Sequence, residues 1–318
     1  LWGAAVGIQE STLRAVVATS SSAPGAAGTP ASATASPAGS STTAASTAAS
    51  TPATSAATSG PSPSPAPAAA AGAPSIKGSL TVFAAASLTD AFKEMKASIE
   101  AANAGTSVAY NFAGSPTLRT QLAQGAKADV FASADQPNMQ GAQKDGTIAA
   151  QPRVFAQNKL TVIVPSANPA GVASLQDLSK SGLKLVLAQK DVPVGNYARQ
   201  VLTKLSADPS YGADYSTKVL ANLKSDEANV KDVVSKVQLG EADAGIVYLT
   251  DVTPSLRGAV KMLDIPDQFN VIAQYPIATV KGAPNDAGAQ AFVDYVLSPA
   301  GQAILAKYGF APAAAQAA

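Results

Sequence analysis

The sequence contains no cysteine and no histidine, and these absences exclude several classes of function. The chain cannot supply a thiolate nucleophile, a Ser-His-Asp triad, or the imidazole and thiolate ligands that zinc usually takes. Its 22 basic and 21 acidic residues leave a formal net charge of +1, so nothing indicates a nucleic-acid surface. No apolar run approaches the roughly 18 residues of a membrane-spanning helix. Enzymes that rely on carboxylate pairs or on lysine stay possible.

Composition divides the chain into three parts. Residues 1–17 have no initiator methionine, and we expect them to be a truncated or misassigned N-terminus. Residues 18–75 consist only of Ala, Ser, Thr, Pro and Gly; they cannot build a core, so a disordered linker is predicted, with compositional drift as the alternative. Residues 76–318 form the predicted folded domain, which is long enough for two lobes of about 100 to 150 residues each.

Short β-branched runs alternate with helical patterns in residues 76–318. This alternation predicts an α/β fold with mainly parallel sheets and helices on both faces. Ligands of such sheets bind at the carboxyl ends of strands, beside helix N-termini. The predicted strands are 80–84, 107–112, 130–132, 160–165, 184–188, 244–248, 260–263 and 275–280. The predicted helices are 88–101, 116–124, 138–145, 195–205, 230–239, 285–297 and 299–308.

Two helix starts in the first half of the domain carry a serine. Ser87 follows a predicted strand and begins a Ser-x-x-Asp pattern that ends at Asp90, typical of an N-cap with an acidic third position. Ser115 follows another predicted strand, and Pro116 stands at the first helical position, where the missing N–H is not needed. Taken alone, each site is better explained as an ordinary cap.

Two further helix starts lie in the second half. Residues 193–197 (PVGNY) open a helix in a turn whose backbone amides could face a ligand, and Asn229 is a plausible N-cap with Asp232 three residues on. Each helix N-terminus offers free N–H groups and about half a positive charge. If all four converge, they supply about two charges, enough to offset a dianion without any Arg or Lys.

Three further polar side chains lie near strand ends. Tyr248 ends the apolar strand AGIVY and could donate its phenol to a ligand, although a tyrosine there can also be a packing residue. Asp129 and Asp135 flank the strand VFASA. Paired carboxylates can perform acid/base catalysis, but no partner acid, nucleophile or metal motif accompanies them. Structural roles are therefore predicted for both aspartates.

At these residues the chain resembles the periplasmic molybdate-binding proteins of ABC transporters. The resemblance covers about residues 79–312, and several segments in the right order and spacing make it specific. The segments are VFAAASLTDAF (82–92), FAGSPTLRTQLAQGAKADVFASAD (112–135), VPVGNYA (192–198), GIVY (245–248) and KYGF (307–310).

The resemblance implies a type II periplasmic-binding-protein fold, in which two α/β lobes are joined by two chain crossings with a ligand cleft between them. Lobe I would hold residues 76–158 and 274–318, lobe II residues 159–273, and the crossings would lie near 155–164 and 271–280. It places the anion contacts on Ser87, Ser115, Val194, Val230 and Tyr248, with the valines donating backbone N–H groups. Molybdenum would enter only as molybdate, at these residues. Two departures, Pro116 in the serine turn and Val194 in place of a smaller residue, bear on selectivity.

The family also implies what such a domain does. An extracytoplasmic binding protein of this kind captures molybdate or tungstate, closes its lobes around it, and delivers it to an ABC permease in the membrane. We expect a monomer without cofactors, periplasmic or tethered to the cell surface through the linker, and not an enzyme. A hydrolase would need a catalytic group with a strongly perturbed pKa in the cleft. Sulfate or phosphate as the ligand, or a ligand-sensing role, remain alternatives.

Overall fold

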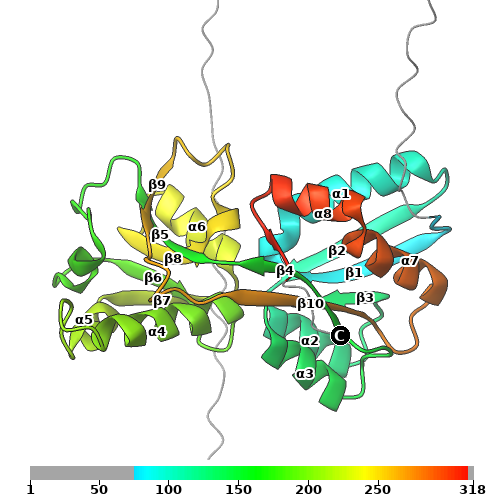
Figure 1. The fold of residues 1–318 in the computed structure, drawn as a ribbon, viewed down its shortest axis with the longest axis horizontal. Helices are drawn as coiled ribbons and strands as arrows, with labels where there is room; N and C mark the ends of the chain where they lie inside the picture. The colour runs from blue at the N-terminus through cyan, green and yellow to red at the C-terminus, as the bar shows by residue number, and fades with distance from the viewer. Residues whose placement is uncertain (1–74, 314–318) are drawn as a thin grey trace, which may run out of the picture. The chain divides into compact units, whose positions relative to one another are not determined.

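Two mixed β-sheets organise residues 75–313, the part of the chain that the computed structural model describes (Figure 1). The first sheet has the strand order β11-β4-β10-β3-β1-β2. Its strands are β1 (Ser79–Ala85), β2 (Ser107–Ala113), β3 (Val130–Ala132), β4 (Arg153–Asn158), β10 (Ala273–Thr279) and β11 (Ala311–Pro312). The predictions for residues 1–17, and for the linker up to residue 74, lie outside the described residues.

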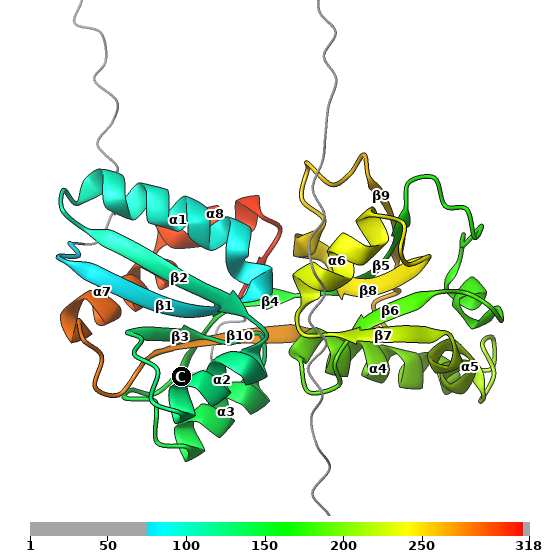
Figure 2. The ribbon, with the colours of Figure 1, turned by 180° about the vertical axis from the view of Figure 1, so that it is seen from behind.

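The helices of the first sheet cover both of its faces. Helices α1 and α8 lie on one side, and α2 and α3 lie on the other, in both views (Figures 1 and 2). The helices packed with this sheet are α1 (Thr89–Ala102), α2 (Ser115–Ala123), α3 (Gln136–Lys144), α7 (Asp286–Leu297) and α8 (Pro299–Lys307). A short 3₁₀ turn, η1 (Ala86–Leu88), leads from β1 into α1. We call this sheet and its helices lobe I.

The second sheet and its helices form lobe II. Its strand order is β7-β6-β8-β5-β9, with α6 on one face and α4 and α5 on the other (Figure 2). Its strands are β5 (Leu160–Pro165), β6 (Leu185–Ala188), β7 (Leu223–Glu227), β8 (Ala244–Tyr248) and β9 (Val260–Asp264). Its helices are α4 (Pro193–Ser206), α5 (Tyr215–Ala221) and α6 (Val230–Gln238), with 3₁₀ turns η2 (Leu175–Ser179) and η3 (Leu249–Asp251).

In the described part of the chain, two segments cross between the lobes. The first crossing is Lys159, the single residue between β4 of lobe I and β5 of lobe II. The second is residues 265–272, between β9 of lobe II and β10 of lobe I. The predicted two-lobed α/β architecture with two crossings is confirmed. Within residues 75–313, no helix has both the length and the apolarity that a membrane span needs.

The prediction of mainly parallel sheets was wrong. Within residues 75–313, four strand pairings are parallel and five are antiparallel. Each antiparallel pairing involves β4, β5 or β10, the strands that flank the crossings. The sequence reading also missed β4, β7, β11 and α5.

Packing follows the local periodicity of each element. In β1, Val82 faces the large core while its neighbour Phe83 faces a smaller core beneath α2 and α3, as the two-residue period of a strand requires. In α4, the buried positions Val194, Ala198, Val201, Leu202 and Leu205 follow the helical period and form one apolar stripe. The cores therefore fix the strand ends and helix starts that meet between the lobes.

Candidate ligand-binding site

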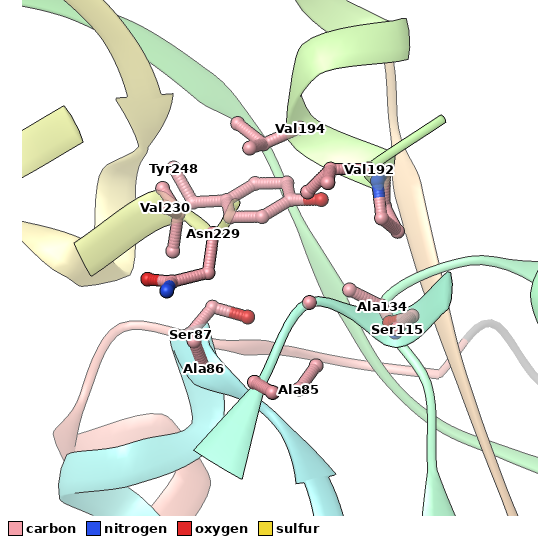
Figure 3. A pocket seen from close by; sticks show the side chains of 13 residues that line it. Ala85, Ala86, Ser87, Ser115, Ala134, Val192, Val194, Asn229, Val230 and Tyr248 are labelled. Carbon is pink, nitrogen blue, oxygen red and sulfur yellow. The ribbon is translucent and has the colours of Figure 1, made fainter. Parts of the chain in front are cut away.

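A small pocket lies where the two lobes meet (Figure 3). The space open to the centre of a water molecule is about 10 Å³, about what one bound water requires. None of its described lining residues carries a charged side chain. Lobe I contributes Ala85, Ala86, Ser87, Ala113, Gly114, Ser115 and Ala134, and lobe II contributes Val192, Pro193, Val194, Asn229, Val230 and Tyr248.

The structure brings all five predicted site residues to this pocket. Ser87 and Ser115 lie on the lobe I side, and Val194, Val230 and Tyr248 on the lobe II side. The starts of η1–α1, α2, α4 and α6 therefore converge on one point, as the helix-start hypothesis required. Together they direct about two positive charge equivalents into a space without formal charge.

Two of the predicted caps were wrong. At both helix starts the backbone N–H groups are therefore not bound by a serine side chain. Ser87 lies inside η1 and makes no capping bond, because its hydroxyl is engaged with Tyr275 instead. Ser115 is the first residue of α2, after the N-cap Gly114, and it too makes no capping bond. The N-cap prediction for Asn229 is confirmed: its side chain accepts from the N–H groups of Lys231 and Asp232.

The hydroxyl of Ser115 is oriented by lobe I. It accepts a hydrogen bond of 3.1 Å from the backbone N–H of Ala134. A backbone N–H can only donate, so the hydrogen of Ser115 is left to be donated elsewhere. Since Ser115 lines the pocket and is almost fully buried, it presents a donor to any ligand there.

Tyr248 supplies a buried hydroxyl that has no partner. Its ring lies across the pocket from Ser87 and Ser115 (Figure 3), and within residues 75–313 its Oη makes no hydrogen bond. Burial raises the pKa of Tyr248 well above its usual value, so the phenol keeps its proton. A buried hydroxyl without a partner costs about 1 to 3 kcal/mol, and a bound acceptor would remove that cost.

Tyr275 and Asn158 are site-supporting residues that the sequence reading missed. Tyr275 Oη lies 3.0 Å from Ser87 Oγ, and Asn158 Nδ2 donates to Tyr275 Oη at 3.3 Å. Both residues are buried. No local pattern marks them, because Ser87 and Tyr275 are 188 residues apart in the sequence.

One lysine beside the pocket is paired with two aspartates. Lys231, the residue after Val230, lies 2.9 Å from Asp90 of lobe I and 3.3 Å from Asp251 of lobe II. Burial alone would lower the pKa of Lys231, but Asp251 and Asp90 raise it overall. Burial raises the pKa of Asp251, whose side chain has no exposed surface. This lysine therefore stays charged without adding net positive charge to the pocket.

The structural roles predicted for Asp129 and Asp135 are confirmed. Asp129 accepts backbone N–H groups from Thr81 at 2.6 Å and Asn285 at 2.7 Å. Asp135 caps α3 by accepting from the N–H of Asn138 at 3.1 Å, and burial raises its pKa. Each carboxylate holds backbone in place and does not line the pocket.

Gly114 sets how closely the lobes approach. A Cβ atom at this position would lie 2.5 Å from the carbonyl oxygen of Ala228, across the pocket in lobe II. Gly195 plays a related part within lobe II, where a Cβ would meet the carbonyl oxygens at the end of β6. Only glycine at these two positions lets the backbones come close enough to surround a small ligand.

Two α/β lobes that close around a pocket of hydrogen-bond donors define a two-lobed solute-binding protein. The family profile of bacterial extracellular solute-binding proteins matches residues 80–311, and the chain belongs to this family. It is 39% identical over 241 residues to the molybdate-binding protein ModA of Mycobacterium tuberculosis H37Rv, which covers 76% of this chain and 87% of that protein.

Solved structures support the fold. The periplasmic molybdate-binding protein of Azotobacter vinelandii has a TM-score of 0.64 and 20% identity, covering 74% of this chain and all of that one. The sulfate-binding protein SubI of Mycobacterium tuberculosis H37Rv has a TM-score of 0.67 and 17% identity, covering 75% of this chain and 88% of that one. The fold is therefore shared by binders of different oxyanions, and the ligand must be argued from the pocket.

Proposed function

We propose that this protein captures molybdate, or tungstate, in the pocket between its lobes and delivers it to an ABC importer. The observation that carries the proposal is a pocket whose polar groups are free as donors: the oriented hydroxyl of Ser115, the unpartnered hydroxyl of Tyr248, and converging helix starts. The side-chain oxygen of Asn229, which also lines the pocket, is already occupied by two N–H groups of α6. Ser87 adds a third hydroxyl, and Val194 and Val230 line the pocket in the first turns of α4 and α6, where backbone N–H groups have no partner within the helix. The ModA relative, with 39% identity, supports the same ligand.

The chemistry of the pocket selects the protonation state of the ligand. Hydrogen phosphate carries a proton that needs an acceptor, and an acceptor-free pocket leaves that proton unpaired at a cost of about 1 to 3 kcal/mol. Sulfate is a proton-free dianion like molybdate, so only size can separate the two. Sulfate is the second candidate, because a sulfate-binding protein shares the fold.

Binding needs movement of the lobes. The pocket has space for about one water, which is less than a four-oxygen anion needs, so the lobes must separate to admit the anion and then close less far around it than they do here. We infer that the closed form docks on the permease, that binding requires no cofactor and no catalysis, and that the chain acts as a monomer. It would work outside the cytoplasm, held by its linker.

A ligand panel tests the proposal. Thermal unfolding of the chain is followed with molybdate, tungstate, sulfate or phosphate at equal concentration. A ligand at about a hundred times its Kd adds roughly 2.7 kcal/mol of stability, which is a shift of several degrees in Tm. We expect this shift with molybdate and tungstate alone. An equal shift with sulfate would move the ligand assignment to sulfate, and no shift with any anion would overturn the proposal.

Replacing Tyr248 with phenylalanine should separate binding from stability. The variant loses a hydroxyl that has no protein partner within the described residues, so the unliganded Tm should stay the same or rise. Molybdate affinity should fall about tenfold or more, because a hydrogen bond to a charged group contributes about 1.5 to 3 kcal/mol. Calorimetric titration measures the affinity.

Tyr215→Phe is the matched control for this variant. Tyr215 lies on α5, away from the pocket, and its buried hydroxyl donates to the carbonyl of Leu175. Loss of this hydroxyl should lower Tm, because the buried carbonyl of Leu175 then has no donor. The affinity for molybdate should be unchanged. If Tyr248→Phe behaved like this control, its hydroxyl would not be a ligand donor.

A further inference from the structure

A chain of hydrogen bonds links the crossing between the lobes to Ser87. Lys159, the whole of the first crossing, donates its backbone N–H to Asn158 Oδ1 at 3.0 Å. Asn158 Nδ2 donates to Thr250 Oγ1 at 2.7 Å and to Tyr275 Oη at 3.3 Å. Tyr275 Oη lies 3.0 Å from Ser87 Oγ. Each of the three side chains from Asn158 to Ser87 is buried.

The Lys159 end fixes the directions of the bonds that Asn158 makes. A backbone N–H can only donate, so the amide of Asn158 must place its oxygen toward Lys159 and its nitrogen toward Tyr275. Both hydrogens of that nitrogen are then used. Tyr275 Oη accepts one of them and keeps a single hydrogen of its own.

Ser87 is the acceptor for that hydrogen. Burial raises the pKa of Tyr275 far above its usual value, so the phenol remains protonated. Within residues 75–313, Ser87 Oγ is the one acceptor paired with it. In the opposite direction the hydrogen of Tyr275 would make no hydrogen bond, because the neighbouring Tyr248 hydroxyl, whose ring packs against that of Tyr275, has no hydrogen-bond partner within residues 75–313; the cost would be about 1 to 3 kcal/mol. The hydrogen of Ser87 is therefore left for the pocket.

We propose that Asn158 and Tyr275 are positioning residues that force Ser87 to act as a donor and so make the pocket selective for fully deprotonated anions. The inference rests on the proposed function, because it names what orients one of the ligand's donors. Ser87 then matches Ser115, whose acceptor side is likewise occupied, by the N–H of Ala134. In each serine one acceptor position is thus already taken and the hydrogen faces the pocket, which disfavours a ligand such as hydrogen phosphate that must donate a hydrogen of its own.

A variant that reverses the hydrogen bond between residue 158 and Tyr275 tests this assignment. In Asn158→Asp a carboxylate oxygen replaces the donor nitrogen, so Tyr275 turns its hydrogen toward residue 158 and draws the hydrogen of Ser87 toward itself. Molybdate affinity should fall about 30-fold, as expected for a lost bond to a charged group. Adding Tyr275→Phe to Asn158→Asp removes the hydroxyl that links residue 158 to Ser87, so the hydrogen of Ser87 is again available to the ligand. The double variant should bind molybdate more tightly than Asn158→Asp alone, although it is less stable.

Two comparisons separate this effect from charge repulsion and from misfolding. Asn196→Asp adds a negative charge in the first turn of α4 without any link to Ser87, and its loss of affinity should be smaller than that of Asn158→Asp. Tyr275→Phe alone should keep molybdate affinity within about threefold and raise hydrogen phosphate affinity, because Ser87 can then accept as well as donate. This selectivity readout remains available if Asn158→Asp fails to fold.

The outcomes test the positioning role of Asn158 and Tyr275 separately from the proposed function, molybdate binding. A double variant that binds no better than Asn158→Asp, or a Tyr275→Phe variant with the selectivity of the original chain, would overturn the positioning role while leaving molybdate binding intact. A chain that in its original form binds none of the four anions by calorimetry would overturn the proposed function itself.

Discussion

Replacing Gly114 with alanine is expected to weaken molybdate binding by about 100-fold or more while both lobes stay folded. The backbone of Gly114 is in an ordinary extended conformation, with φ −61° and ψ 140°, so alanine causes no local strain. Its Cβ would, however, lie 2.5 Å from the carbonyl oxygen of Ala228 in the other lobe. Normal contact requires the lobes to stay about 1 Å further apart, which withdraws the lobe II donors from the anion.

Three measurements check this expectation. Calorimetry gives the affinity, small-angle X-ray scattering reports whether molybdate still compacts the chain, and thermal unfolding without ligand should be nearly unchanged. Gly258→Ala is the matched control, since a Cβ there meets nothing within 4 Å and should alter none of the three. Binding of molybdate to Gly114→Ala with the original affinity would show that the contact with Ala228 does not limit closure.

The sequence predicts the elements whose apolar residues repeat clearly, and it fails where that signal is weak. Strands such as β1 and β8 consist largely of buried apolar residues and were located from the sequence within one or two residues. The edge strand β7 reads Leu-Lys-Ser-Asp-Glu, with no fully buried position, so nothing distinguished it from a loop. Antiparallel pairing at the crossings was also missed, because pairing partners are set by topology and not by local sequence.

The site shows a similar division. Helix-start patterns and a family resemblance pointed to Ser87, Ser115, Val194, Val230 and Tyr248, and all five line the pocket. The residues that orient or charge-balance these groups were not predictable, because each interaction joins distant parts of the chain. Asn158 and Tyr275 are 117 residues apart, and Lys231 and Asp90 are 141 apart. Local patterns therefore identify the residues that line the pocket, whereas only the fold reveals the residues that orient them.

Replacing Lys231 with methionine is expected to lower the free energy of unfolding by about 2 to 3 kcal/mol at pH 7, because it leaves a buried carboxylate without its partner. Asp251 has no exposed surface, and the ammonium of Lys231 lies 3.3 Å away. The loss falls toward the lower end of what buried pairs show, since the lysine side chain is 28% exposed. Chemical denaturation at several pH values measures it.

The stability loss of Lys231→Met should depend on pH through the pKa of Asp251. Burial raises the pKa of Asp251 in the folded chain, so the folded state takes up a proton there more readily than the unfolded state, whose pKa is about 3.9. Ionising Asp251 therefore costs stability as the pH rises through these two values. Losing Lys231 raises the folded-state pKa further. The deficit of Lys231→Met should be fully present above that pKa and disappear as the pH falls toward about 4.

Two variants identify which carboxylate is responsible. Lys231→Met combined with Asp251→Asn removes the buried charge as well, and it should recover most of the stability at pH 7. Asp90→Asn removes the other partner of Lys231, whose side chain is 39% exposed, and it should cost less than about 1 kcal/mol. If Lys231→Met instead lost the same stability at every pH, or if the double variant recovered nothing, the effect would come from packing of the lysine side chain and not from the charge of Asp251.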